Sequence, residues 1–364
     1  MIRVGHDDHP AMNKLFPTTD PASILVTRRD NIGDMLCTTP LIRGIRRRYP
    51  EAHLAVLASS YNYDAIAGNG NVDEVFVFEK RQQHRGFLNY LRMLLTRMKL
   101  LVAVRSRKFD VIILANGGWR YARKLNGKKV IGFHDAGKSN RDQPDTVIPL
   151  KNGLTKHEVE KMAELGAVLD LDARETLGKM SLKSDPSLVS AVRERLSGAG
   201  WSPDRKTIGV HISSRRPRQR WPEEKFISLI RRLHTVDPEL QFILLWSPGT
   251  RRSSMHPGDD IMAENIQRAC AGLPLFPLPT QRVSELIASM ECCDQFIGSD
   301  GGAMHVAAAL EKPILCFFGD SHRAEWFPWG VPFVLLQPDS LSVPDISVDE
   351  AEAGFLELQG KLNP

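Results

Sequence analysis

Short apolar runs typical of β-strands alternate along this chain with longer stretches that carry the apolar periodicity of a helix. The first series predicts strands at residues 24–27, 53–58, 75–78, 111–114 and 129–133, and helices at 35–49 and 88–104. Parallel strands need long crossover connections, which are usually helical, so this alternation predicts a parallel sheet covered by helices. The fold class is therefore α/β.

The same alternation restarts in the second half of the chain. Expected helices at residues 156–169 and 186–196 form a connector. Strands at 207–212, 241–246, 295–297 and 313–318 and helices at 223–234, 283–290 and 304–310 follow it. A chain of 364 residues is long enough for two domains. We expect a flexible leader (1–22), two Rossmann-like doubly wound domains (23–180 and 181–345) and a C-terminal helix (346–364).

Composition narrows the class of protein. The first 23 residues carry no apolar run, which argues against a signal peptide or a membrane span. Five cysteines without a CxxC pair favour neither a disulfide framework nor a zinc knuckle, so we expect a cytoplasmic protein. A net charge of +5 is too small to indicate a nucleic-acid partner.

The first predicted strand leads through residues 28–34 directly into a helix, which places Gly33 and Asp34 at the carboxyl end of a strand. Ligands of doubly wound folds bind at such ends. Asp34 could act there as a general base, or it could simply cap the helix, since a carboxylate near a helix N-terminus is favourable.

A basic loop follows the first strand of the second series. Residues 213–222 contain two serines and four arginines, and Pro222 and Glu223 are well suited to begin a helix. Arginine matches phosphate oxygens, and Ser213 and Ser214 add hydroxyl donors, so the loop suits an anion. The alternative is an ordinary solvated basic loop.

A glycine turn connects another predicted strand to an Ala-rich helix. Asp300, Gly301 and Gly302 lie in this turn, and His305 follows in the helix. Backbone amides at a helix N-terminus bind anions, although the glycines could also form only a tight turn. Because the basic loop and the glycine turn follow strands of the same domain, a diphosphate could lie between them.

Two further segments allow more than one interpretation. Residues 132–139 satisfy the P-loop spacing GxxxxGK[ST], but residues 140–145 include Pro144 and cannot supply the long helix that such a loop needs. Residues 80–108 contain nine Lys or Arg and no acidic residue, interleaved with apolar side chains. This helix either covers the sheet with a solvated basic face or contacts anionic lipid or an acidic acceptor.

Four blocks, in this order, resemble glycosyltransferase family 9, the ADP-heptose:lipopolysaccharide heptosyltransferases. They are residues 24–41, the Trp221-Pro222 pair after the basic loop, residues 299–309, and residues 318–330. The resemblance implies a GT-B fold, with the acceptor on the N-terminal domain and the nucleotide-sugar on the C-terminal domain. It implies an inverting enzyme that needs no metal or other cofactor.

The resemblance also implies roles for single residues. Asp34 would be the catalytic base, and the other implied site residues would bind the donor: Ser213, Ser214, Arg218, Arg220, Gln281, Asp300, Gly301, Gly302 and His305. Among these, Arg218, Arg220, His305 and the amides of Gly301 and Gly302 would stabilise the diphosphate leaving group. Gln281 would line the adenine pocket.

Three departures bear on the donor. The family commonly has a lysine shortly before Trp-Pro, where this chain has Arg218 and Arg220. The family's Asp-Thr-Gly is Asp-Gly-Gly at residues 300–302 of this chain. Residues 247–250 contain no glutamate that could bind the ribose. We expect transfer of heptose from ADP-heptose to a lipopolysaccharide-core or related surface-glycan acceptor, with a possible peripheral inner-membrane contact through residues 80–108. Alternatives are another nucleotide-sugar, a protein acceptor, a sugar-nucleotide epimerase or hydrolase, or a non-catalytic nucleotide-sugar-binding protein.

Overall fold

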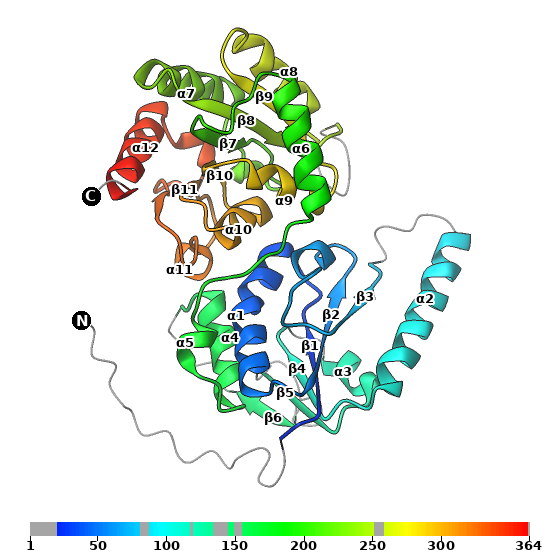
Figure 1. Cartoon of the computed structure of the whole chain (residues 1–364). Coiled ribbons are helices and arrows are strands. Elements are labelled where there is room, and N and C mark those ends of the chain that lie inside the picture. Colours follow the sequence, from blue (N-terminus) through cyan, green and yellow to red (C-terminus); the bar gives the residue numbers. More distant parts are fainter. Residues whose placement is uncertain are drawn as a thin grey trace, which may run out of the picture.

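The computed structural model describes residues 20–80, 87–116, 119–133, 145–148, 155–250 and 258–362, and these form two parallel six-stranded sheets (Figure 1). The first sheet has the order β3-β2-β1-β4-β5-β6, and the second has the order β12-β11-β10-β7-β8-β9. When the strands of the second sheet are counted from β7 and read from the β9 edge, their order is the same as that of the first sheet. Both are therefore doubly wound, as the alternation predicts.

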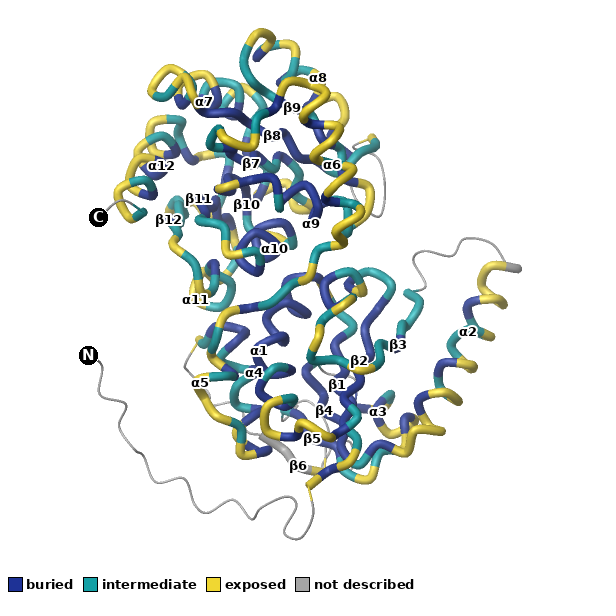
Figure 2. Tube along the Cα trace, viewed as in Figure 1, coloured by how far each residue is buried: buried dark blue, intermediate teal, exposed yellow. Residues whose placement is uncertain are grey.

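The strands are short and mostly buried, because each parallel strand is covered by helices on both faces. Their bounds are β1 (Ser23–Thr27), β2 (His53–Ser59), β3 (Glu74–Phe78), β4 (Val111–Leu114), β5 (Lys129–Phe133), β6 (Thr146–Ile148), β7 (Thr207–His211), β8 (Gln241–Trp246), β9 (Leu275–Pro279), β10 (Gln295–Ser299), β11 (Ile314–Phe317) and β12 (Phe333–Leu336). Figure 2 shows the buried residues concentrated along these strands and along α1 and α10.

The helices cover the sheets and connect their strands. Their bounds are α1 (Ile32–Arg48), α2 (Phe87–Ser106), α3 (Trp119–Leu125), α4 (Glu158–Ala167), α5 (Ala173–Thr176), α6 (Pro186–Gly198), α7 (Glu223–Val236), α8 (Asp260–Ala269), α9 (Val283–Glu291), α10 (Gly302–Ala309), α11 (Arg323–Trp326) and α12 (Val348–Leu362). Three short 3₁₀ turns, η1 (Tyr63–Ala65), η4 (Pro217–Gln219) and η5 (Val343–Asp345), lie in the described loops. The terminal helix α12 packs against α7, β11 and β12.

Sequence analysis missed three strands, β6, β9 and β12. Pro277 and Pro279 interrupt the strand pattern of β9, yet β9 pairs only with β8 and forms an edge of the second sheet. Proline is tolerated on edge strands because it lacks only an N–H group that a central strand would need. Most of the expected leader, and residues 134–139 of the P-loop-like segment, lie outside the described residues.

The two domains meet through α1 and α10 (Figure 1). A Cβ atom added to Gly302 of α10 would lie 3.3 Å from Cδ1 of Ile32 at the start of α1. Farther along the interface, Nε1 of Trp329 donates a hydrogen bond to the carbonyl of Gly178, at 3.1 Å. The end of β1 and the start of α10 therefore face each other across the domain interface.

Candidate active site

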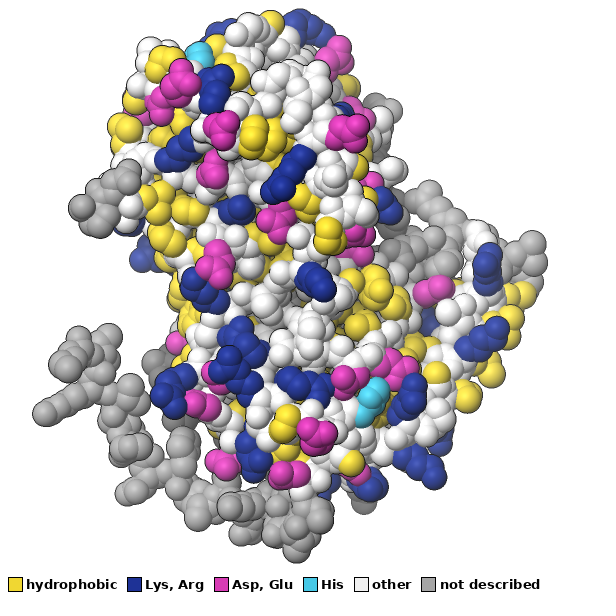
Figure 3. Space-filling view, viewed as in Figure 1, with side chains coloured by type: hydrophobic (Ala, Val, Ile, Leu, Met, Phe, Trp, Pro, Cys, Tyr) yellow, Lys and Arg dark blue, Asp and Glu magenta, His cyan; other side chains and the backbone are white. Residues whose placement is uncertain are grey.

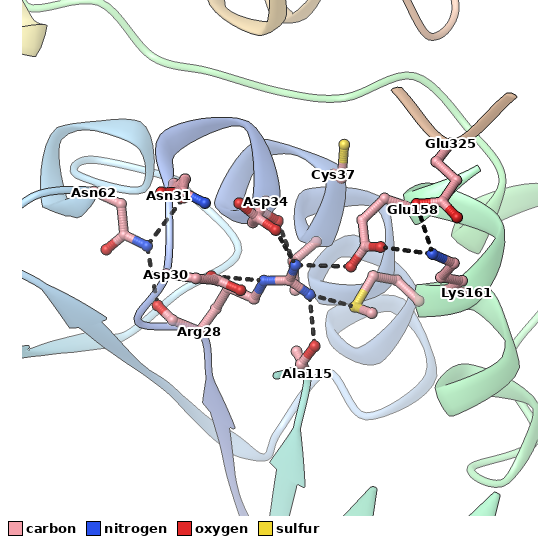
Figure 4. Close-up of polar contacts among 12 residues, drawn as sticks. Arg28, Asp30, Asn31, Asp34, Cys37, Asn62, Ala115, Glu158, Lys161 and Glu325 are labelled. Atoms are coloured by element: carbon pink, nitrogen blue, oxygen red, sulfur yellow. Dashed lines mark hydrogen bonds and ion pairs between the residues drawn. The ribbon is translucent and has the colours of Figure 1, made fainter. Parts of the chain in front are cut away.

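A buried arginine organises the end of β1 (Figure 4). The Arg28 guanidinium, 2% exposed, donates to Asp30 (2.9 Å), to Asp34 (2.7 Å) and to Glu158 (2.7 Å). It also donates to the carbonyl of Ala115, at the end of β4, so it bridges the two strands at which the order of the first sheet reverses. Burial alone would lower the pKa of Arg28, but the three carboxylates raise it, and the guanidinium stays charged.

Two of these carboxylates differ in how they titrate. Burial favours the neutral form of Asp34, but the charge of Arg28 and hydrogen bonds from Asn31 and Arg28 hold the pKa of Asp34 below its usual value. Asp30 accepts the Nε–H of Arg28, and burial raises the pKa of Asp30 to about 6. At neutral pH Asp34 is thus a fixed carboxylate in the first turn of α1, where the helix dipole also favours it.

His305 of α10 approaches Asp34 from the other domain. A Cβ on Gly33 would lie 2.9 Å from Cγ of His305, so only glycine leaves room for the imidazole beside α1. Burial lowers the pKa of His305, while the charges of Asp300 and Asp34 act in the opposite direction. Its Nδ1 atom is buried without a hydrogen-bond partner in the described part of the chain. The structure therefore brings Asp34 and His305 together, as the sequence analysis expects of a shared site.

The glycine turn opens α10 without a side-chain cap at Gly301. The first N–H groups of a helix have no partner within it, and a Cβ on Gly301 would meet nothing within 4 Å, so this end of α10 is open to an anion. Asp300 lies just before it and accepts hydrogen bonds from Ser321 (2.6 Å) and Gln219 (3.2 Å). Asp300 thus joins the loops around the helix end.

The arginines of the basic loop have different surroundings. Arg220 forms an ion pair with the buried carboxylate of Asp259 and donates to the carbonyl of Ser214, at 2.5 Å. Ser213 donates its hydroxyl to the same Asp259, at 2.7 Å. The loop is therefore fixed through Arg220 and Asp259. It presents Arg215 and Arg218 as exposed cations without an ion-pair partner among the described residues.

Gln281 lies apart from these groups. It follows the edge strand β9, its side chain is exposed, and its backbone N–H donates to Glu285 at 2.8 Å. The glycine turn follows β10 and the basic loop follows β7, and β8 lies between β7 and the edge strand β9. All of these loops leave the same carboxyl edge of the sheet. A ligand reaching from α10 to Gln281 would cross the ends of β7 and β8.

His157 has a structural place in the interface. Its Nδ1 atom caps α4 by accepting from the N–H of Val159, and its Nε2–H donates to the carbonyl of Phe327, at 2.9 Å. The ring lies against Phe327 and Trp329, with centroids 4.5 and 4.6 Å away. Burial lowers the pKa of His157 to about 3. His157 therefore caps the start of α4 and contacts the other domain.

Sequence reasoning missed Arg28, Glu158 and Asp259 as site residues. Arg28 and Glu158 are 130 positions apart, and Asp259 lies 39 positions after Arg220, so no local spacing connects either pair. The sequence did contain one signal for Arg28, which directly follows an apolar strand. An arginine at such a position becomes buried, and a buried arginine requires carboxylate partners.

A second arginine marks the N-terminal side of the site. The Arg29 guanidinium lies over the rings of Tyr121 (4.1 Å) and Phe78 (4.7 Å). The Nε atom of Arg29 and the hydroxyl of Tyr121 are buried without a hydrogen-bond partner among the described residues. Unsatisfied buried polar groups are uncommon, and here they lie beside the end of β1.

The described residues contain neither a metal-binding cluster nor a membrane-spanning helix. No group of three or more His, Cys, Asp or Glu side chains within them is arranged to hold a metal ion. No helix among them is long and apolar enough to cross a bilayer. The five cysteines are buried and unpaired.

Known proteins resemble this chain in sequence and in fold. The family model described as "Glycosyltransferase family 9 (heptosyltransferase)" matches residues 97–344. Lipopolysaccharide heptosyltransferase 3 of Escherichia coli is 24% identical over 307 residues, which are 82% of this chain and 83% of that protein. A family 9 glycosyltransferase from Veillonella parvula superposes with a TM-score of 0.75 at 19% identity, covering 93% of this chain and 97% of its own.

A structure of E. coli ADP-heptose lipopolysaccharide heptosyltransferase II superposes with a TM-score of 0.70, also at 19% identity, over 94% of this chain and all of that one. These likenesses and the two facing parallel sheets confirm the expected GT-B fold. Since the family model covers well over half of the sequence, the chain belongs to glycosyltransferase family 9 and is a glycosyltransferase.

Proposed function

We propose that this enzyme transfers a heptose, with inversion and without a metal, from ADP-heptose to a lipopolysaccharide inner-core acceptor in the cytoplasm. The names of its relatives support the sugar and the acceptor. The observation that carries the proposal is the position of Asp34. It is a carboxylate fixed by Arg28 in one domain and facing His305 and the open start of α10 in the other.

Asp34 serves as the base in this proposal. An acceptor hydroxyl gives its proton to the carboxylate as its oxygen attacks the anomeric carbon, and the bond from that carbon to the diphosphate oxygen breaks. A single displacement of this kind inverts the anomeric centre. The leaving diphosphate carries the negative charge that develops, and groups on the donor side must stabilise it.

The donor side supplies cations and N–H groups for that charge. The amides at Gly301 and Gly302 meet the diphosphate at the start of α10, and His305 can donate to it. Arg218 takes the place of the family lysine, because Arg220 is already paired with Asp259. Ser214 lies beside them, Ser213 and Asp300 hold the loops, and Gln281 contacts the base of the nucleotide.

The acceptor side is centred on Arg29. Its guanidinium lies over the rings of Phe78 and Tyr121, close to the end of β1 and the Arg28 network. Aromatic rings and unsatisfied polar atoms suit a sugar, and the arginine suits an anionic substituent on that sugar.

Asp34→Asn tests the base directly. The amide keeps the shape but cannot accept the proton, so transfer should fall by about a hundredfold or more. Donor binding should persist, because the base acts on the acceptor. Transfer is measured by release of nucleotide and by mass spectrometry of the glycan. Asp204→Asn, at an exposed loop before β7, is the matched control and should retain full activity.

A panel of ADP, UDP, GDP and CMP sugars tests the donor. A ligand that binds only the native state raises the melting temperature, so ADP-heptose should stabilise the protein and the UDP and GDP sugars should not. Stabilisation by a UDP or GDP sugar alone would keep the fold and refute the donor. Consumption of ADP-heptose without any acceptor would instead indicate an epimerase or hydrolase.

A further inference from the structure

Helix α2 presents two apolar faces. Met93, Leu100 and Val104 are at most 9% exposed, and Leu100 and Val104 belong to the core cluster that includes residues of the first sheet. Four other apolar side chains are exposed: Leu91 (40%), Leu95 (60%), Met98 (64%) and Val102 (67%). Around a helix of ~3.6 residues per turn, the mean directions of the two sets differ by roughly 170°. The exposed set therefore points directly away from the protein; we call it the outer face of α2.

Basic residues border the outer face. Arg92, Lys99 and Arg105 on α2 and Lys108 just after it are exposed, and residues 87–108 contain no Asp or Glu. In the space-filling view, Lys and Arg side chains lie among apolar ones along α2, at the right (Figure 3). The surface thus combines an exposed apolar stripe with positive charge on its borders.

The direction of α2 relates this face to the site. Arg97 donates to the carbonyl of Glu79, just beyond β3, whereas Arg107 donates to Glu74 at the beginning of β3. α2 therefore runs antiparallel to β3, and its N-terminal end lies toward the carboxyl edge of the first sheet (Figure 1). Asp34 lies at that same edge.

We propose that the outer face of α2 lies in the surface of an anionic lipid bilayer. The four apolar side chains enter the boundary between headgroups and acyl chains, and the flanking cations contact lipid phosphates. The proposal rests on the proposed function in one respect, because a membrane contact is useful only if the acceptor sugar is carried by a lipid. The acceptor sugar would then lie just above the membrane, at the edge of the sheet that carries Asp34.

Charge argues for lipid and against a second copy of the chain. Two outer faces packed on each other would bring Arg92 and Lys99 of one helix close to the same residues of its mate. No carboxylate on α2 could compensate them. An anionic lipid surface supplies the missing negative charge along the whole stripe.

Sedimentation with vesicles tests the proposal on the full chain without any sugar nucleotide. The protein should bind vesicles of phosphatidylcholine with phosphatidylglycerol, should bind pure phosphatidylcholine far less, and should be released by salt. Met98→Asp should weaken binding by at least about tenfold, since it puts a carboxylate into the apolar stripe. The matched control is Ile261→Asp, which makes the same change at a 73% exposed residue of α8 and should bind normally.

Other results would overturn the proposal. Vesicle binding by Met98→Asp that equals wild-type binding is one such result, and an equal loss of binding in Met98→Asp and Ile261→Asp is another. A third is a wild-type dimer that dissociates in Met98→Asp but not in Ile261→Asp. Transfer to a delipidated core oligosaccharide is measured in parallel and should be unchanged in Met98→Asp. If the wild type binds vesicles but transfers no heptose to that acceptor, the proposed function fails while the membrane contact stands.

Discussion

Arg28 holds together the charged groups at the end of β1. One guanidinium holds three carboxylates from two distant parts of the chain, and all of them are largely buried. Removing one partner of a buried charge group leaves the others uncompensated. The contact that fixes Asp34, the proposed base, therefore also stabilises the N-terminal domain.

Arg28→Met should be strongly destabilising. The methionine fills part of the volume but leaves Asp30, Asp34 and Glu158 without their cation, and the expected loss is about 3–5 kcal/mol. Urea unfolding at neutral pH measures it. Arg174→Met removes a fully exposed ion pair with Asp172 and should leave the unfolding curve nearly unchanged. A similar midpoint for the two variants would show that Arg28 is not the organiser described here.

The pH dependence of kcat/KM separates the two carboxylates on Arg28. The pKa of Asp34 is lowered, so a base at this position stays ionised well into the acid range, and the acid limb should lie below the usual range of a carboxyl group. Because the pKa of Asp30 is raised to about 6, an acid limb near pH 6 that disappears in Asp30→Asn would assign the base to Asp30 instead.

Among the elements, α1 and α10 determine how closely the two domains approach. The pattern of short strands and helices predicts both, because their signals are local. The sequence also placed Gly33 at a strand end and His305 in the helix after the glycine turn, but it did not reveal that the two residues touch. Gly33 and His305 come from opposite domains, and only the folded chain shows that the glycine accommodates the imidazole.

Gly33→Ala should therefore reduce transfer. Its methyl group overlaps the His305 ring, so α10 must move away from α1 and the distance between Asp34 and the donor grows. We expect a fall in kcat of about a hundredfold, since small misplacements of reacting groups have effects of this size. A second change, His305→Ala, removes the overlap. If steric overlap is the cause, the kcat of the double variant should approach that of His305→Ala alone. A kcat that stays as far from His305→Ala as that of Gly33→Ala would exclude this cause.

At the scale of the whole molecule, His157 joins the domains through an uncharged ring. Its pKa in the folded chain is about 3, whereas an unfolded histidine titrates near 6.5. As pH falls below about 6.5, the unfolded chain takes up the proton first. The stability that the neutral ring provides is therefore complete above that pH and is lost progressively toward pH 3.

The His157→Asn variant isolates this effect. Asparagine can still cap α4 but has no titration in this range. Between pH 7 and pH 5 the free energy of unfolding should fall by about 2 kcal/mol more in the wild type than in the variant. Asp30 titrates in the opposite sense, but it is present in both proteins and cancels in the comparison. Parallel curves for the two proteins would contradict the buried neutral state.

The sequence predicted the two-sheet architecture and most of the residues near the site, because strand and helix patterns and strand-end motifs are local. It could not predict Arg28 with Glu158 or Arg220 with Asp259, since those pairs form only when distant segments meet. It also missed β9, because the prolines that mark an edge strand are the residues that weaken a strand signal.

Those prolines have a consequence for the protein at high concentration. β9 is an edge of the second sheet, and of its five residues Pro277 and Pro279 have no N–H to offer to another strand. A neighbouring chain, folded or newly made, cannot complete a regular ladder along this side. The residues that hide β9 from sequence analysis thus protect the enzyme against edge-to-edge aggregation.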